Sequence, residues 1–145
     1  MKKVNYSRQR EAIKSFLATR KDHPTAEVVY SEIRKEYPNI SLGTVYRNLS
    51  LLTELGEIQK ISCGDDREHY DADTSTHSHF ICSNCHAVID LVMDNLCFIN
   101  SLAQANFDGK IEGHSVHFYG LCPKCLQSIQ EKSDSVTEEN KQEKN

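Results

Sequence analysis

The 145-residue chain has no long hydrophobic run, no tryptophan and only three prolines. No apolar stretch approaches the roughly 18 residues that a membrane-spanning helix needs, which excludes a membrane protein. The N-terminal stretch MKKVNYSRQR also lacks the apolar core and small-residue cleavage site of a signal peptide, and we find no internal repeat. We therefore expect a cytoplasmic protein of one or two small domains with a mixed α/β (α+β) fold.

Charge is distributed unevenly along the chain. Residues 1–62 carry 11 Lys and Arg against 7 Asp and Glu, a net +4, whereas residues 63–145 carry 6 against 14, a net −8. A chain whose charge changes sign in this way suggests two units with different partners. The basic half could meet phosphate, and the acidic half, rich in His and Cys, could hold cations.

Three helices are expected in the basic half. Ser7 precedes apolar residues at helical spacing, which leaves Arg8 and Arg10 available to solvent. Thr25 can cap a second helix that ends at Tyr37-Pro38. Ser41 can cap a third, and Gly56 follows its end, where a left-handed residue is favoured. The inward positions share an i, i+3, i+4 spacing: Ala12, Ile13, Phe16, Leu17, Val29, Ile33, Tyr37, Leu42, Val45, Leu49 and Leu52.

A hairpin is expected directly after Gly56. Two strand-like runs, 58–63 and 67–72, flank the turn residues Gly64, Asp65 and Asp66. Three helices followed by a small hairpin predict a winged helix-turn-helix domain over residues 1–72. In this motif the helix before the hairpin enters the major groove of DNA.

The outer face of that third helix offers candidate DNA contacts. Arg47 can reach guanine or a phosphate, Thr44 lies on the same face with Leu51, and the ring of Tyr46 can contact a thymine methyl. Arg8 and Arg10 are further candidates for contacts with DNA. The alternative is that Tyr46 is half-buried core and Arg47 a solvated charge.

The rest of the chain predicts a small α/β unit. Residues 73–76 are small and polar and are the expected hinge, and residues 77–132 form the second domain. Its expected elements are strands at 79–81, 87–92 and 110–121 and a helix at 96–107. Residues 133–145 are too polar to bury anything, and we expect them to form a disordered tail.

Four of the six cysteines form two CxxC pairs that are 36 residues apart: Cys82, Cys85, Cys122 and Cys125. Two such pairs can place four thiolates on one tetrahedral zinc ion, which leaves no position for water or substrate and so makes the site structural. The alternative is redox-active CxxC motifs, but a thioredoxin-like motif needs a long helix directly after it and is usually single. We favour structural zinc and expect no enzymatic activity.

A second set of potential ligands mixes three imidazoles and two carboxylates: His23, Asp71, His77, His79 and Asp90. This nitrogen and oxygen set suits Fe(II), Mn(II) or Zn(II) better than Cu(I). A His-x-His on a strand directs both rings to one face, as a shared metal requires. The alternative is that these histidines are polar surface, and that His23 is a capping residue.

From Ser7 to Cys125 the chain resembles the Fur family of metal-dependent repressors. The resemblance rests on HPTAEVVY (23–30), SLGTVYRNL (41–49), HYD (69–71), HSHFICSNC (77–85), VID (88–90) and HSVHFYGLCPKC (114–125). It implies a homodimer that binds palindromic operator DNA through N-terminal winged helices and dimerises through the C-terminal domain. It further implies that the four cysteines hold structural zinc and that the His and Asp set holds a regulatory Fe(II) or Mn(II).

Within the resemblance, Asp at 71 and 90 rather than Glu favours the peroxide-sensing branch, in which iron-catalysed oxidation of His23 or His77 would release DNA. The alternative is an uptake regulator for iron, manganese or zinc. The family's other metal site would fall on Thr76, Ser78, Cys97 and His114, of which only His114 is a family ligand type. We expect His114 and His117 to be structural. Cys63 and Cys97 have no identifiable metal partner, and His86 stands where the family commonly has Gly.

Overall fold

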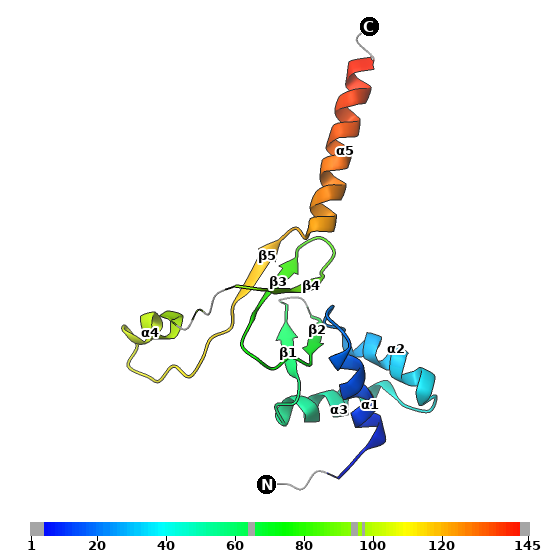
Figure 1. The fold of residues 1–145 in the computed structure, drawn as a ribbon, viewed down its shortest axis with the longest axis vertical. Coiled ribbons are helices and arrows are strands. Elements are labelled where there is room, and N and C mark those ends of the chain that lie inside the picture. The colour runs from blue at the N-terminus through cyan, green and yellow to red at the C-terminus, as the bar shows by residue number, and fades with distance from the viewer. Residues whose placement is uncertain (1–4, 64–65, 94–95, 97, 143–145) are drawn as a thin grey trace. The chain divides into compact units, whose positions relative to one another are not determined.

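The protein is described by a computed structural model, which covers residues 5–63, 66–93, 96 and 98–142 (Figure 1). The chain divides after Thr76 into two compact units, residues 1–76 and 77–145, which we call the N-terminal and C-terminal units. The described helices and strands together make a mixed α and β protein, as predicted. None of the described helices is both long and apolar enough to cross a membrane.

The N-terminal unit begins with three helices, α1 (Arg8–Ala18), α2 (Ala26–Glu36) and α3 (Leu42–Glu54). The Ser7 and Ser41 hydroxyls accept hydrogen bonds from the backbone N–H groups of Arg10 and Thr44, at 3.4 and 3.1 Å. Thr25 occupies the N-cap position of α2, but its side chain makes no capping hydrogen bond. Gly56 has a φ of +69°, so α3 ends where the sequence predicts.

Buried apolar side chains from all three helices form the core of this unit. The fully inaccessible positions include Ile13, Val29, Val45 and Leu49, each of which the helical spacing assigns to the interior. Ala12, Phe16 and Tyr37 pack at the edge of this core and are only partly buried. The spacing therefore identified the correct helix faces.

A two-stranded antiparallel hairpin follows the helices. β1 (Gln59–Ser62) pairs with β2 (Glu68–Asp71), with Gln59 opposite Asp71. Ile58 and Tyr70 anchor the hairpin in the helical core. Three helices followed by a hairpin make a winged helix-turn-helix fold. The expected turn residues Gly64 and Asp65 lie outside the described residues.

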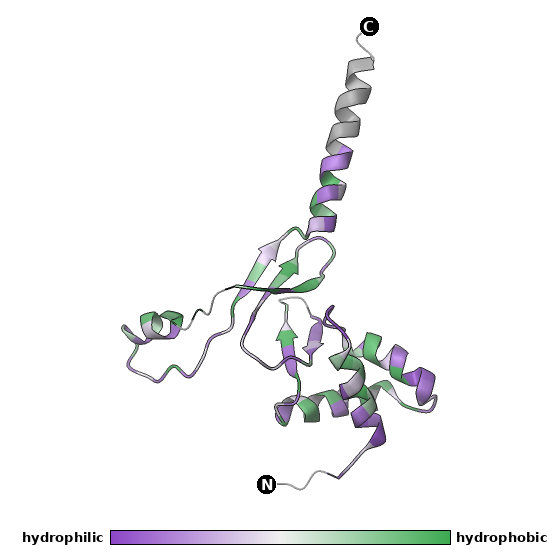
Figure 2. Ribbon diagram, in the orientation of Figure 1, coloured by the Kyte–Doolittle hydropathy of each residue, from purple (hydrophilic) through white to green (hydrophobic). Residues whose placement is uncertain are grey.

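The C-terminal unit is built on a three-stranded sheet of order β4-β3-β5. The central β3 (Ser78–Cys82) pairs antiparallel with β4 (Val88–Leu91) and parallel with β5 (His117–Gly120). Helix α4 (Phe98–Gln104) stands apart from this sheet, and α5 (Pro123–Gln142) leaves the end of β5 (Figure 1). β3 begins with the polar Ser78 and His79 and ends in an apolar run, green in Figure 2, that supplies the buried Ile81 and Cys82.

Three predicted elements of this unit differ from the structure. The strand expected over 110–121 is limited to His117–Gly120, because β5 pairs only with the short β3. The helix expected over 96–107 is limited to Phe98–Gln104. The backbone of residues 133–142 continues α5 instead of forming a disordered tail, because Glu, Lys and Gln favour helix once preceding turns exist; residues 143–145 lie outside the described residues.

Candidate metal centres

The four CxxC cysteines converge at one end of the C-terminal sheet. Cys82 ends β3, Cys85 lies in the turn after it, and Cys122 and Cys125 flank the start of α5. Their sulfur atoms all lie within 4.8 Å of one another, and the Sγ atoms of Cys85 and Cys122 are 3.7 Å apart. Four sulfurs on one zinc ion, at about 2.3 Å from the metal, are about 3.8 Å apart. The cluster therefore fits structural zinc, as predicted.

Groups around the cysteines favour the thiolate form of Cys82. Its pKa is lowered to about 6 by hydrogen bonds from the backbone N–H groups of Cys85 and Cys122. The Cys122 N–H lies 3.3 Å from the Cys82 sulfur, and the Asn84 side-chain amide donates to the Cys125 sulfur at 3.2 Å. The Ala87 backbone N–H lowers the pKa of Cys85, but the side chain of Cys82 and burial outweigh it, so this pKa is raised to about 11. Such backbone donors are the outer contacts that orient thiolate ligands.

Three of the predicted regulatory ligands lie together on the C-terminal sheet. His77 precedes β3, and His79 on β3 lies directly opposite Asp90 on β4. The Oδ1 atom of Asp90 is 3.1 Å from the Nε2 atom of His77 and 3.5 Å from that of His79. The two imidazole centroids are 4.4 Å apart. A two-residue spacing on one strand and one cross-strand pair thus assemble two nitrogens around a carboxylate.

The other two predicted ligands form a buried pair in the N-terminal unit. The Nε2 atom of His23 is 3.3 Å from the Oδ2 atom of Asp71, and their side chains are 2% and 6% exposed. His23 lies between α1 and α2 with a φ of +50°, a left-handed conformation that non-glycine residues seldom adopt. Asp71 ends β2, and its Oδ1 atom accepts a hydrogen bond from the Asp73 N–H at 2.8 Å.

Two residues of β2 hydrogen-bond to the segment around His23. One of them is His69, whose role the sequence analysis did not predict. The Nδ1 atom of His69 donates to the His23 carbonyl oxygen at 2.7 Å, and the Tyr70 N–H donates to the Pro24 carbonyl at 3.1 Å. His69 is 8% exposed, and its Nε2 atom has no hydrogen-bond partner among the described residues. The available signal was its position two residues before Asp71, which directs both side chains to one face.

The outer face of α3 carries a connected set of polar side chains. The Arg47 guanidinium donates to the Thr44 hydroxyl at 2.9 Å, and the Tyr46 hydroxyl donates to a Glu27 carboxylate oxygen at 2.8 Å. This hydrogen bond lowers the pKa of Glu27 and raises that of Tyr46. Tyr46 is 38% exposed, so it is not a core residue.

The two arginines of α1 that are predicted to contact DNA differ in exposure. Arg8 is exposed, whereas Arg10 is half-buried and donates to the Asn5 carbonyl oxygen.

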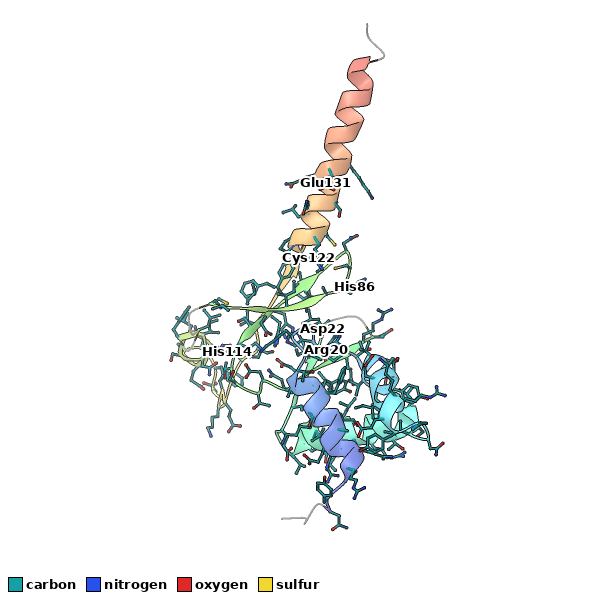
Figure 3. The ribbon with its side chains drawn as sticks, turned by 45° about the vertical axis from the view of Figure 1, so that its right-hand side comes forward. Arg20, Asp22, His86, His114, Cys122 and Glu131 are labelled. Carbon is teal, nitrogen blue, oxygen red and sulfur yellow. The ribbon has the colours of Figure 1, made fainter. Side chains whose placement is uncertain are left out.

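Of the other described His and Cys residues, His86, His114 and Cys63 are not part of the four-cysteine cluster. His114 lies in the segment between α4 and β5 (Figure 3), and its Nδ1 atom is 2.8 Å from the Asn100 side-chain oxygen. His86 is exposed and has a φ of +59°, where glycine would be unstrained. Cys63 is buried, and Cys97 lies outside the described residues.

The donor types decide which ions these residues fit. Neutral imidazoles and carboxylates suit Fe(II), Mn(II) and Zn(II), and four thiolates suit zinc. The four-cysteine cluster lies entirely within the C-terminal unit. The His and Asp residues comprise one pair in the N-terminal unit and one group of three in the C-terminal unit.

Comparison with known proteins gives consistent matches over most of the chain. The profile of the Ferric uptake regulator family matches residues 1–119. The peroxide-responsive repressor PerR of Staphylococcus aureus (strain USA300) is 34% identical over 122 residues, which cover 84% of this chain and 82% of that protein.

Two solved structures share the fold. The Campylobacter jejuni peroxide stress regulator is 32% identical with a TM-score of 0.69, over 81% of this chain and 88% of that one. The Helicobacter pylori ferric uptake regulator is 23% identical with a TM-score of 0.74, over 85% of this chain and 83% of that one.

Proposed function

We propose that this chain, which belongs to the Ferric uptake regulator family, is a metal-dependent repressor that binds palindromic operator DNA as a cytoplasmic homodimer and senses hydrogen peroxide. The observation that carries the proposal is the pairing of two incomplete ligand sets, His23 with Asp71 and His77 with His79 and Asp90, in two separate units. Neither set satisfies Fe(II) or Mn(II) alone, whereas together they offer five ligands and leave one octahedral position open.

The linker between the two ligand sets is short. Asp71 ends β2 and His77 precedes β3, so five residues, 72–76, separate them. Six Cα–Cα steps can span at most about 22 Å, which limits the separation of the Asp71 and His77 Cα atoms. His23, Asp71, His77, His79 and Asp90 would hold a shared Fe(II) or Mn(II), whose charge would offset that of the two carboxylates. Ligand sharing would fix the angle between the units, and so the spacing of two α3 helices in a dimer.

The α3 helix supplies the proposed DNA-reading residues. Arg47 and Thr44 are already linked by a hydrogen bond, which holds the guanidinium on the outer face of the helix. Tyr46 offers an exposed ring edge next to them. In the major groove Arg47 would contact guanine, and Arg8 and Arg10 on α1 would contact phosphates.

The peroxide response is the part of the proposal that the two aspartates and the peroxide-responsive relatives support. Asp71 and Asp90 occupy the positions that favour this branch over an iron-uptake regulator. The oxidation targets would be the imidazoles of His23 and His77, each of which lies within 3.3 Å of a ligand carboxylate. An oxidised imidazole binds metal less well, so the two ligand sets would separate and the DNA would be released. The alternative is an iron, manganese or zinc uptake regulator without this response.

Mass spectrometry tests the proposal directly. The full-length protein is loaded with Fe(II) or with Mn(II), exposed briefly to dilute peroxide and digested. We expect one added oxygen on the peptides containing His23 and His77 in the iron-loaded sample only, together with loss of operator binding. Unmodified histidines, with operator binding that still follows metal concentration, would identify an uptake regulator instead. The Mn(II)-loaded sample is the control for oxidation that does not depend on iron.

A further inference from the structure

The ring of His117 lies beside that of His79 on the neighbouring strand. β3 and β5 pair in parallel with His79 opposite His117, and the two ring centroids are 6.0 Å apart at an interplanar angle of 69°. His77, two residues before His79, has its ring centroid 4.4 Å from that of His79. Three imidazoles therefore follow one another across one face of the C-terminal unit.

His117 has the features of an available ligand. Its side chain is half-buried and takes part in no hydrogen bond or ion pair within the part of the chain that the structure describes. By contrast, His114, three residues earlier, contacts the Asn100 side chain at 2.8 Å. An imidazole without a fixed partner can rotate toward an ion with little loss of existing contacts.

The separations suit a shared ion. Imidazole nitrogens bind zinc at about 2.0–2.1 Å, which places two ring centroids about 5 Å apart at a tetrahedral angle. The His79 and His117 centroids, at 6.0 Å, are about 1 Å farther apart than this separation. Asp90 provides the fourth donor, because its Oδ1 atom already lies 3.1 Å from His77 and 3.5 Å from His79.

We propose that His117 joins His77, His79 and Asp90 in a four-ligand zinc site contained entirely in the C-terminal unit. Three nitrogens and one oxygen satisfy tetrahedral Zn(II). Mn(II) and Fe(II) take more ligands and accept oxygen readily, so they still require His23 and Asp71. The inference rests on the proposed function, since it assigns a regulatory consequence to the same residues. Zinc bound by the C-terminal unit alone would not use His23 and Asp71 as ligands, and so would not join the two units.

Metal titrations of the full chain test this site. The protein, with its four-cysteine cluster already filled with zinc, is titrated with Zn(II) or Mn(II) against a chelating dye. The variants are His117→Ala, His23→Ala and the matched control His114→Ala. The optical spectrum of Co(II) added in place of the second zinc reports the geometry, because its visible bands are strong in tetrahedral and weak in octahedral sites.

We expect His117→Ala to weaken second-site zinc binding by about 100-fold and to remove the strong Co(II) bands, with Mn(II) affinity changed less than about twofold. His23→Ala should weaken Mn(II) binding and leave second-site zinc affinity and the Co(II) bands unchanged. His114→Ala should change neither the zinc affinity nor the Mn(II) affinity. Unchanged zinc affinity in His117→Ala, or equal losses of zinc and manganese in His23→Ala, would overturn the site. If His117→Ala loses zinc but His23→Ala keeps manganese, the zinc site stands and the shared-ligand function fails. His117→Gln and circular dichroism control for folding.

Discussion

The two sets of metal ligands in this protein differ in how they are distributed over the fold. The four cysteines lie in one unit, at the end of β3 and the start of α5, and their sulfurs all lie within 4.8 Å of one another. The His and Asp ligands are divided between the two units. A closed set within one unit can only stabilise that unit, whereas a divided set can report its occupancy as a change between units.

The difference also appears in the groups around the ligands. The sulfurs of Cys82 and Cys125 accept hydrogen bonds from backbone and side-chain amides, and those donated to Cys82 lower its pKa. The His and Asp ligands contact one another directly, as in the His23 and Asp71 pair, and Asp71 also accepts a hydrogen bond from the Asp73 backbone N–H. The donors around the sulfurs suit permanent occupancy by an ion.

Opening the cysteine cluster should have the largest effect. We expect Cys122→Ser to lose zinc and the tertiary structure of the C-terminal unit, because structural zinc contributes about 10–16 kcal/mol to small domains of this kind. Metal analysis and thermal unfolding measure this change. Cys63→Ser, at a buried cysteine away from the cluster, is the matched control and should retain zinc. A folded, zinc-free Cys122→Ser protein would contradict the structural role.

Removing one ligand from either part of the divided set should abolish the metal response but keep the fold. For His23→Ala and His77→Ala we expect operator binding that no longer depends on Mn(II), with zinc content and the unfolding transition preserved. Operator affinity measured with and without Mn(II) tests this expectation. If the two substitutions behave differently, so that only one of them removes the response, the two sets do not share one ion.

A residue that supports the divided set should have a smaller effect. His69→Ala removes the hydrogen bond to the His23 carbonyl, which stabilises a left-handed segment. We expect Mn(II) affinity to fall about 10- to 100-fold, as for other groups that orient ligands. His69→Asn keeps a donor and should recover part of the loss. Equal losses in both variants would show that packing, and not the hydrogen bond, positions His23.

The spacing of residues in the sequence predicted correctly those features of the fold that depend on residues close together in the chain. The capping serines, the helix faces and Gly56 all follow from local periodicity and turn chemistry. The convergence of the two CxxC pairs was predictable because a tetrahedral ion demands it.

Contacts between distant segments were not predictable in the same way. The register of β5 beside β3 places His117 next to His79, and no local signal fixes that register. The contact of His69 with the His23 carbonyl likewise joins residues 46 positions apart. The strand predicted over 110–121 was too long for the same reason, since its length depends on its partner.

The proposed DNA-reading helix, α3, provides the finest test of the comparison, because none of the predicted metal ligands lies on it. For Arg47→Ala, measured in the Mn(II)-loaded protein, we expect operator binding to weaken by about 1–3 kcal/mol while binding to random DNA changes little. Within the described part of the chain, the Arg47 side chain donates its hydrogen bond to Thr44, which is not a metal ligand, so zinc content and Mn(II) affinity should stay at their original values. An equal loss on random DNA would reassign Arg47 to a phosphate contact. A change in Mn(II) affinity would instead couple α3 to the divided ligand set without DNA.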